Sequence, residues 1–421
     1  MSERILLCLA HMSGKEMDFI KEAFDQNWVV PLGPNVNGFE KDLEEFVNGR
    51  EGAAPLDKKV VALSAGTAAV HLALIACGVK AGDEVIVQSF TFCASSHPVT
   101  YLGATPVFVD SEKDTWNMDP ELLEEAIKDR IAKTGRKPKA IVPVALYGMP
   151  YNITKIMEIA NRYEIPVVED AAEGFGSRFN GQVLGTFGKY GVLSFNGNKM
   201  ITTSGGGALI CADDEAKKQI MWYATQARES YPYYQHEAIG YNYRMSNICA
   251  GIGRGQMTVV DEHIAHHRHV QALYKELLKD VKGITLHEAP SPEYDSNYWL
   301  CTATLDSDLK IKGQDKAYAE VITGAVGGAA GVTHATKSAH TALEPNANVE
   351  AMRMFLDAAG IESRPLWKPM HCQPVYKDAP AYTNGVSESL FRVGICLPAG
   401  PWVTDDHVRY IVDKIKAAIE L

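Results

Sequence analysis

The sequence offers little that is typical of secreted, membrane or metal-binding proteins. Its 421 residues include 8 cysteines, and no two form a Cys-x-x-Cys pair, which argues against a disulfide framework or a zinc site, so no metal is expected. No apolar run reaches the length of a transmembrane helix. The opening stretch 1–10 is too short and too acidic for a signal peptide. We therefore expect a soluble cytoplasmic protein.

Positive charge is also scarce. The chain has 41 Lys and Arg against 52 Asp and Glu, a formal net charge of −11, which disfavours nucleic acid or an anionic membrane as a partner. An anionic substrate must therefore meet a local cluster of cations. The length predicts two or three domains, and the 46% of hydrophobic residues is enough for a large core.

One lysine, Lys199, stands among glycine and small polar residues in the stretch 194–207. An apolar run at 190–193 precedes this stretch and another at 208–210 follows it, so we expect two strands with Lys199 on the loop between them. Loops at strand ends are where α/β sheets bind ligands. A glycine-rich hairpin with an incidental lysine is the alternative on this stretch alone.

A carboxylate follows another expected strand. The run 165–168 is typical of a buried strand, and it ends in Glu169 and Asp170. A carboxylate at a strand end can pair with a protonated pyridine nitrogen, and a lysine in the same pocket can form a Schiff base with an aldehyde. Pyridoxal phosphate needs both groups. Lys199 and Asp170 together therefore indicate this cofactor.

These motifs resemble the fold-type I pyridoxal-phosphate enzymes and, more closely, the sugar aminotransferases of the DegT/DnrJ/EryC1/StrS family. The resemblance is carried by Glu-Asp-Ala-Ala-Glu at 169–173, by Ser194 five residues before Lys199, and by Ser-Gly-Gly-Gly at 204–207. It extends from about residue 11 to about residue 400.

The resemblance implies an α/β fold with a mainly parallel central sheet flanked by helices. Alternating strand and helix patterns along the first half of the chain predict the same sheet. A large cofactor-binding domain with an N-terminal arm is expected at 1–260, and a smaller C-terminal α/β domain at 261–421. An irregular insert at about 310–348 departs from the family pattern and has no assigned role.

Two residues are expected to be catalytic. The resemblance implies that Lys199 holds the cofactor and moves the proton, while Asp170 keeps the pyridine nitrogen protonated. Gly66 and Thr67 stand at an expected helix N-terminus, where free N–H groups and the helix dipole favour phosphate. The full expected cofactor-binding set is Gly66, Thr67, Phe92 (stacked on the ring), Asp170, Glu173, Ser194, Lys199, Asn242 and Arg244.

The substrate is expected to meet two further stretches. Arg, Lys, His and Trp converge on the proline-stiffened stretch 364–371, which would suit an anionic nucleotide with a flat base, an interdomain linker being the alternative. The other stretch, 27–30, matches the family's active-site lining, with a packing arm as the alternative. The expected substrate-binding residues are Asn27, Trp28, Val29, Val30, Arg364, Pro365, Leu366, Trp367, Lys368 and His371.

The stretch Gly-Tyr-Asn-Tyr-Arg-Met at 240–245 resembles a family motif that reaches into the neighbouring subunit's site. The resemblance therefore implies a homodimer with shared active sites, in which Asn242 and Arg244 meet the partner's cofactor phosphate. An aromatic loop with a surface arginine is the alternative.

Further motifs resemble the aminotransferases of the UDP-bacillosamine pathway, namely Ser-Phe-Asn-Gly-Asn-Lys at 194–199, Thr-Gln-Ala-Arg-Glu at 225–229 and the stretch 363–371. They imply transfer of an amino group from L-glutamate to C4 of a UDP-4-keto-6-deoxy-N-acetylhexosamine, for an amino-deoxy sugar of surface glycans. The alternatives are C3 or other nucleotide-sugar amination and a non-catalytic cofactor-binding sensor. Sugar 3-dehydratases of this family carry histidine where this chain has Lys199.

Two other patterns have simpler interpretations. Glycines at 251, 253 and 255 lack the preceding strand and the spacing of a dinucleotide loop, so we expect them to allow close helix packing. His263 and His267 share one face of an expected helix, 261–278. They could bind a metal, but we expect a solvated, charged helix face.

Overall fold

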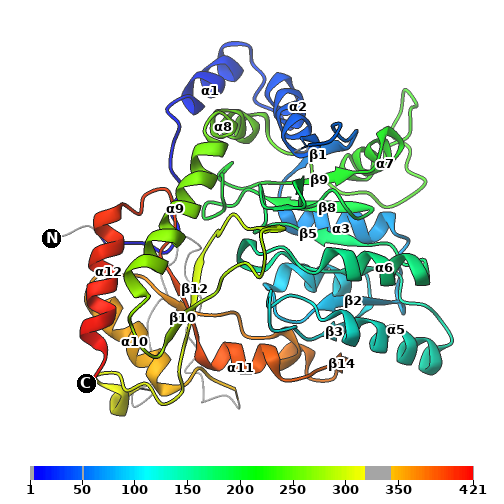
Figure 1. Cartoon of the computed structure of the whole chain (residues 1–421). Coiled ribbons are helices and arrows are strands. Elements are labelled where there is room, and N and C mark those ends of the chain that lie inside the picture. Colours follow the sequence, from blue (N-terminus) through cyan, green and yellow to red (C-terminus); the bar gives the residue numbers. More distant parts are fainter. Residues whose placement is uncertain (1–3, 50–51, 318–342, 421) are drawn as a thin grey trace.

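The computed structural model describes residues 4–49, 52–317 and 343–420. Most of the predicted insert at 310–348 lies outside the described residues. Two layered α/β units are visible in Figure 1, with the central sheet and its helices on one side and α9 and α12 on the other. This arrangement confirms the predicted α/β fold with a mainly parallel sheet.

The central sheet combines two four-stranded ladders, which the parallel bridges Ile141–Val167 and Val144–Asp170 join edge to edge. Only β9 runs antiparallel to its neighbours; every other pairing is parallel. In order across the sheet, the strands are β1 (Lys59–Leu63), β9 (Gly207–Cys211), β8 (Tyr190–Ser194), β5 (Val168–Asp170), β4 (Ile141–Val142), β2 (Glu84–Gln88), β3 (Thr105–Val109) and β14 (Ala381–Tyr382).

Helices cover this sheet, which explains why its strands are almost continuously apolar and buried. The ends of the helices are set by side-chain caps. Asp119 accepts N–H bonds at the start of α5, Asn152 at the start of α6 and Asp213 at the start of α7. The helices of this layer are α3 (Gly66–Ala76), α4 (His97–Tyr101), α5 (Pro120–Thr134), α6 (Ile153–Tyr163) and α7 (Asp214–Ala224).

An N-terminal arm of α1 (Glu16–Asp25) and α2 (Pro34–Asn48) packs on α8 (Asn247–Met257) at the top of Figure 1. The glycines of α8 make this contact possible. A Cβ on Gly255 would lie 2.8 Å from Glu16 Cα, and a Cβ on Gly253 would lie 2.7 Å from the Phe39 ring. The prediction that these glycines allow close helix packing is confirmed.

The long helix α9 (Val260–Leu278) leads into the second unit, whose four strands all pair antiparallel. The chain does not stay there, because β14 returns to the first sheet beside β3. The buried Asp110 carboxylate, just past β3, accepts backbone N–H bonds from Asn384, Gly385 and Ser387 and so ties the two units together. The elements of the second unit are β10 (Ile284–Leu286), β12 (Cys301–Leu305), β15 (Gly394–Leu397), β13 (Arg364–Pro365), α10 (Ala347–Ala358), α11 (Val386–Val393) and α12 (Asp405–Ala418).

The prediction of a solvated face on α9 is wrong at His263 and His267, because both residues are buried. Their Nδ1 atoms contact backbone carbonyl oxygens, that of Met200 at 3.3 Å and that of Tyr298 at 3.2 Å. Burial lowers the pKa of His267 to about 3. The histidines therefore act as neutral packing residues, because α9 is covered by the Lys199 loop on one side and by the approach to β12 on the other.

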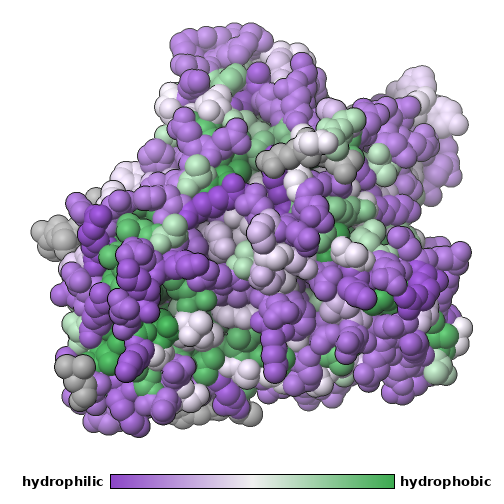
Figure 2. Space-filling model, viewed as in Figure 1, coloured by the Kyte–Doolittle hydropathy of each residue, from purple (hydrophilic) through white to green (hydrophobic). Residues whose placement is uncertain are grey.

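A small sheet of β6 (Arg178–Phe179), β7 (Gln182–Val183) and β11 (Tyr294–Asp295) completes the strands of the described chain. The face drawn in Figure 2 is largely hydrophilic, and the apolar residues that show lie mostly in hollows between elements. Across the described residues, no helix combines the length and the apolar character needed to cross a membrane.

Candidate active site

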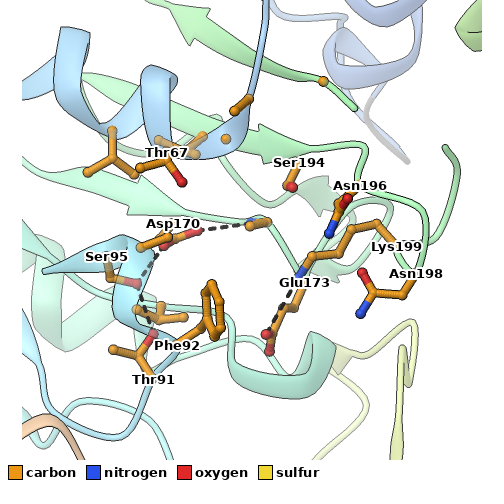
Figure 3. A pocket seen from close by; sticks show the side chains of 18 of the residues that line it. Thr67, Thr91, Phe92, Ser95, Asp170, Glu173, Ser194, Asn196, Asn198 and Lys199 are labelled. Atoms are coloured by element: carbon orange, nitrogen blue, oxygen red, sulfur yellow. Dashed lines mark hydrogen bonds and ion pairs between the residues drawn. The ribbon is translucent and has the colours of Figure 1, made fainter. Parts of the chain in front are cut away.

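A cavity of about 260 Å³ opens where β5 and β8 end and α3 begins. Eight of the predicted site residues line it: Gly66, Thr67, Phe92, Asp170, Glu173, Ser194, Lys199 and Trp367. Figure 3 shows Lys199 entering from the β8–β9 loop and Asp170 from the end of β5. The two strands that the sequence predicts around Lys199 are confirmed as β8 and β9.

The Asp170 carboxylate is 5% exposed and is fixed by two donors. Ser95 Oγ donates to Oδ2 at 2.6 Å, and the backbone N–H of Ala172 donates to Oδ1 at 3.1 Å. Thr91 Oγ1 lies 2.8 Å from Ser95 Oγ and completes a buried chain of hydroxyl groups. Burial raises the pKa of Asp170, while the Ser95 hydroxyl, the Ala172 N–H and the Lys199 charge lower it. A cation beside this carboxylate would offset the free-energy cost of burying its negative charge.

Lys199 sits in a tight turn, with its backbone N–H donated to the carbonyl of Asn196 at 3.0 Å. Its Nζ lies 3.6 Å from Glu173 Oε1 and 4.1 Å from the centre of the Trp299 ring. The lysine side chain is 13% exposed, so its amine faces the cavity and not bulk water.

Glu173 is the second buried carboxylate of the cavity, at 5% exposed. The backbone N–H of Tyr147 donates to Oε2 at 2.6 Å. Burial raises the pKa of Glu173, and the charge of Lys199 opposes that shift. Two carboxylates and one amine thus share a space from which water is largely excluded, where each charge acts strongly on the others.

The opposite wall is built to receive a compact anion. Gly66 begins α3, so the first N–H groups of that helix are free of intrahelical partners. A Cβ on Gly207 would lie 2.3 Å from the Gly66 nitrogen, and a Cβ on Gly66 would lie 3.0 Å from Ser194 Cβ. Only glycine at these positions lets the helix end, β9 and Ser194 approach one another.

These features fit pyridoxal phosphate. Lys199 offers an amine, Asp170 offers a buried carboxylate, and Gly66 and Thr67 offer a helix N-terminus. All four residues line the cavity. The Oδ1 atom of Asn198 is buried at the cavity without a hydrogen-bond partner among the described residues. A ligand that donates a hydrogen bond would satisfy this acceptor.

A second cavity, of about 360 Å³, shares Thr91, Phe92 and Trp367 with the first. The rings of Phe92 and Trp367 lie 5.4 Å apart between the two spaces. The predicted substrate residue Lys368 lines this second cavity together with His97. Aromatic surface and the lysine cation of Lys368 therefore adjoin the Lys199 cavity.

The other predicted residues of 364–371 support this wall without lining either cavity. Arg364 pairs with Glu362 at 2.8 Å, Pro365 continues β13 after Arg364, and Leu366 is buried. His371 Nδ1 lies 2.6 Å from Ser89 Oγ, and its Nε2 lies 3.3 Å from Glu388 Oε1.

Two groups of predicted residues do not line the cavity. Asn27, Trp28, Val29 and Val30 follow α1, and the last three remain 37–48% exposed. Asn242 is exposed, whereas Arg244 directs Nη1 to the sulfur of Met221. The Tyr243 carbonyl between them accepts the N–H of Ser64, a cavity residue, at 2.8 Å.

Ser95, which contacts Asp170, and Trp299, which contacts Lys199, are among the site residues that are not predicted from the sequence. Ser95 is brought to Asp170 by the turn at 93–95, and Trp299 comes from the approach to β12, about a hundred residues beyond Lys199. Ser95 belongs to no motif, and the stretch around Trp299 indicates only the start of a strand in the second domain, so only the packing of distant segments brings the two residues to the site.

Comparison with known proteins agrees with this geometry. The model of the DegT/DnrJ/EryC1/StrS aminotransferase family matches residues 11–320 and 328–416. The putative pyridoxal phosphate-dependent aminotransferase EpsN of Bacillus subtilis (strain 168) is 41% identical over 99% of this chain and 96% of its own length. A GDP-perosamine synthase of Escherichia coli O157:H7 is 32% identical over 96% of this chain and 95% of its own.

Among solved structures, a DegT DnrJ EryC1 StrS aminotransferase from Brucella abortus has a TM-score of 0.79 at 27% identity, covering 96% of this chain and 95% of that one. The family match spans nearly the whole chain, and the cavity supplies the amine, carboxylate and anion site that the cofactor requires. The chain therefore belongs to the DegT/DnrJ/EryC1/StrS aminotransferase family and is a pyridoxal-phosphate-dependent sugar aminotransferase.

Proposed function

We propose that the protein transfers an amino group from L-glutamate to C4 of a UDP-4-keto-6-deoxy-N-acetylhexosamine, in the synthesis of an amino-deoxy sugar for surface glycans. The proposal of a nucleotide-linked substrate is supported by the second cavity. This cavity shares Phe92 and Trp367 with the Lys199 cavity and is also lined by Lys368. Its aromatic walls and cation suit a flat base and a diphosphate. A keto-sugar could then occupy the first cavity.

Pyridoxal phosphate supplies an aldehyde that condenses with amines and a pyridine ring that takes up electrons. Lys199 serves as the base that removes a proton from the donor Cα and as the acid that delivers one in the second half of the reaction. Asp170 would keep the pyridine nitrogen protonated. Gly66, Thr67 and Ser194 would hold the phosphate, and the buried wall around Glu173 excludes water.

The alternative regiochemistry, amination at C3, has support among the relatives. The UDP-2-acetamido-2-deoxy-3-oxo-D-glucuronate aminotransferase of Pseudomonas aeruginosa is 36% identical over 59% of this chain and 65% of its own length. The C4 assignment depends instead on the motifs at 194–199, 225–229 and 363–371. The two reactions therefore have to be separated by their products.

A panel of nucleotide keto-sugars distinguishes these outcomes. The panel contains UDP-linked 4-keto-6-deoxy and 3-keto N-acetylhexosamines and a GDP-linked 4-keto-6-deoxyhexose, each with L-glutamate and the purified enzyme. We expect one amino-sugar product from the UDP-4-keto substrate, identified by mass, and NMR should place the new nitrogen on C4. Preferred turnover of the 3-keto or the GDP-linked substrate would contradict the proposal, and no turnover with any amino donor would favour a sensor.

We further infer that the protein is a homodimer with shared sites. The N-terminal arm exposes Met17, Phe24 and Leu32 at 51–67%, and the loop beside α7 in Figure 1 exposes Tyr234 and Ile239 at 76% and 83%. Large apolar side chains exposed on these two segments would suit a protein contact surface. A second copy of the chain is the partner that the motif at 240–245 favours, with Asn242 exposed beside that loop.

Mixed dimers test the shared site. Lys199→Ala chains and Arg244→Ala chains are each expected to be severely impaired, because one lacks the amine and the other a phosphate contact of its partner. In an equal mixture half of the dimers are mixed, and one site of each is intact, so about a quarter of the wild-type activity should return. The measurement is turnover before and after subunit exchange, which mass spectrometry of the intact dimers verifies.

Size measurement first establishes that the Arg244→Ala chain still dimerises. If exchange is complete and activity stays at the level of the separate variants, Arg244 does not act in the partner's site.

A further inference from the structure

Trp299 is a cavity residue for which neither the sequence motifs nor the cofactor chemistry provides a role. It is 2% exposed, and its ring centre lies 4.1 Å from Lys199 Nζ. The indole Nε1–H donates to the backbone carbonyl of Asn198 at 2.7 Å, the residue directly before Lys199. The same side chain therefore tethers the lysine loop and presents a ring face to the amine.

The segment that carries Trp299 is itself held firmly. Asn297 is fully buried, and its Oδ1 accepts the backbone N–H of Trp299 at 2.8 Å. Its Nδ2 donates to the carbonyls of Glu173 and Phe175, both at 2.9 Å. Asn297 thus links the Trp299 segment to the loop that bears Glu173, while Trp299 links it to the loop that bears Lys199.

The backbone at residues 148 and 298 has the special conformations that the insertion of Asn297 and Trp299 requires. Tyr298, between Asn297 and Trp299, has φ +49°, a left-handed conformation that costs energy in a non-glycine residue. A Cβ on Gly148, whose φ is +94°, would lie 1.9 Å from Asn297 Oδ1. The chain therefore needs glycine at 148 and accepts backbone strain at 298 where Asn297 and Trp299 are inserted.

We propose that Trp299 is a positioning residue that holds the free amine of Lys199 between its ring face and the Glu173 carboxylate. This inference rests on the assignment of Lys199 as the catalytic amine. A lysine side chain has many rotamers, and ordering it is entropically unfavourable. Glu173 alone, at 3.6 Å, is too distant for a short hydrogen bond. The ring supplies the second wall by a cation–π contact, for which tryptophan is the best residue.

The test uses Trp299→Leu, which removes the ring, and Trp299→Phe, which keeps a ring face but loses the N–H bond to Asn198. Trp402→Phe is the matched control, because its Nε1 also donates to a backbone carbonyl, that of Ala10 at 2.8 Å, far along the chain from the site motifs. Thermal unfolding identifies any variant that fails to fold.

The first readout is modification of Lys199 in cofactor-free protein by an amine-acylating reagent, measured by peptide mass spectrometry against the exposed Lys189 as internal reference. We expect Trp299→Leu to speed modification about tenfold, because the amine loses its charge-stabilising ring and becomes accessible. We expect an intermediate rate for Trp299→Phe and no change for Trp402→Phe.

The second readout is turnover, which should change in the opposite direction. We expect kcat of Trp299→Leu to fall about tenfold with the KM for L-glutamate within about twofold, since misplacement affects the proton transfer and not donor binding. Wild-type rates in both readouts for a folded Trp299→Leu would overturn the proposal. Borohydride reduction of the wild-type holoenzyme separately checks Lys199: cofactor attached to another residue would overturn the catalytic assignment and this inference with it.

Discussion

Lys199→Ala is expected to reduce turnover by at least about 10⁴-fold, because in the proposed reaction the lysine both attaches the cofactor and moves the proton. Among the residues that line the cavity, Lys199 is the only one with an amine. The two buried carboxylates, Asp170 and Glu173, cannot take over attachment, since they do not condense with an aldehyde. The measurement is the steady-state rate of amino-sugar formation with saturating cofactor.

Lys189→Ala is the matched control, because Lys189 precedes β8 on the surface and does not line the cavity. Its rate should stay within about twofold of the wild type. The Lys199→Ala protein should bind pyridoxal phosphate only reversibly, so that reduction with borohydride leaves no labelled peptide. Turnover near the wild-type rate would place the catalytic amine elsewhere.

The strand ends of this site could be predicted because each proposed catalytic residue follows an apolar run that is typical of a buried strand. Lys199 and Asp170 are of this kind, as are Gly66 and Thr67 at the start of α3. The periodicity of the sequence determines such elements locally, and the sheet order then brings their ends together at one edge.

The remaining features depend on contacts between distant segments, which no local pattern encodes. His263 and His267 are polar residues on one face of α9, so their positions in the sequence predict a solvated face. In the structure that face is covered by the Lys199 loop and by Tyr298. Trp299 looks like an ordinary strand-entry residue until Asn297 anchors it to the Glu173 loop. Ser95 reaches Asp170 only because a short turn at 93–95 follows β2.

Asp170→Asn is expected to lower turnover about 10²–10⁴-fold while the protein retains some cofactor, since removing one partner of a buried charge pair costs about 3–5 kcal/mol. The amide has the shape of the carboxylate: its oxygen can accept the Ala172 N–H while its NH2 group donates to the Ser95 hydroxyl oxygen, but it cannot stabilise a protonated pyridine nitrogen. Asp213→Asn is the control, because asparagine caps a helix as well as aspartate does. Near-normal kinetics would place the pyridine partner elsewhere.

The same substitution should have the opposite effect on the stability of the cofactor-free protein. Burial raises the pKa of Asp170 above its unfolded value, so the folded state binds the proton more tightly than the unfolded state does. The free energy of unfolding then falls as pH rises from the unfolded pKa of Asp170 through its folded pKa, so at neutral pH the buried carboxylate destabilises the cofactor-free protein. The amide introduced by Asp170→Asn carries no charge, so the cofactor-free variant should unfold at the same temperature as the wild type or a higher one.

The wild type should gain more in unfolding temperature than Asp170→Asn when pyridoxal phosphate is added, because only the carboxylate acquires a cationic partner. A cofactor-free variant that unfolds well below the wild type at pH 7 would show that Asp170 serves the fold and not the cofactor.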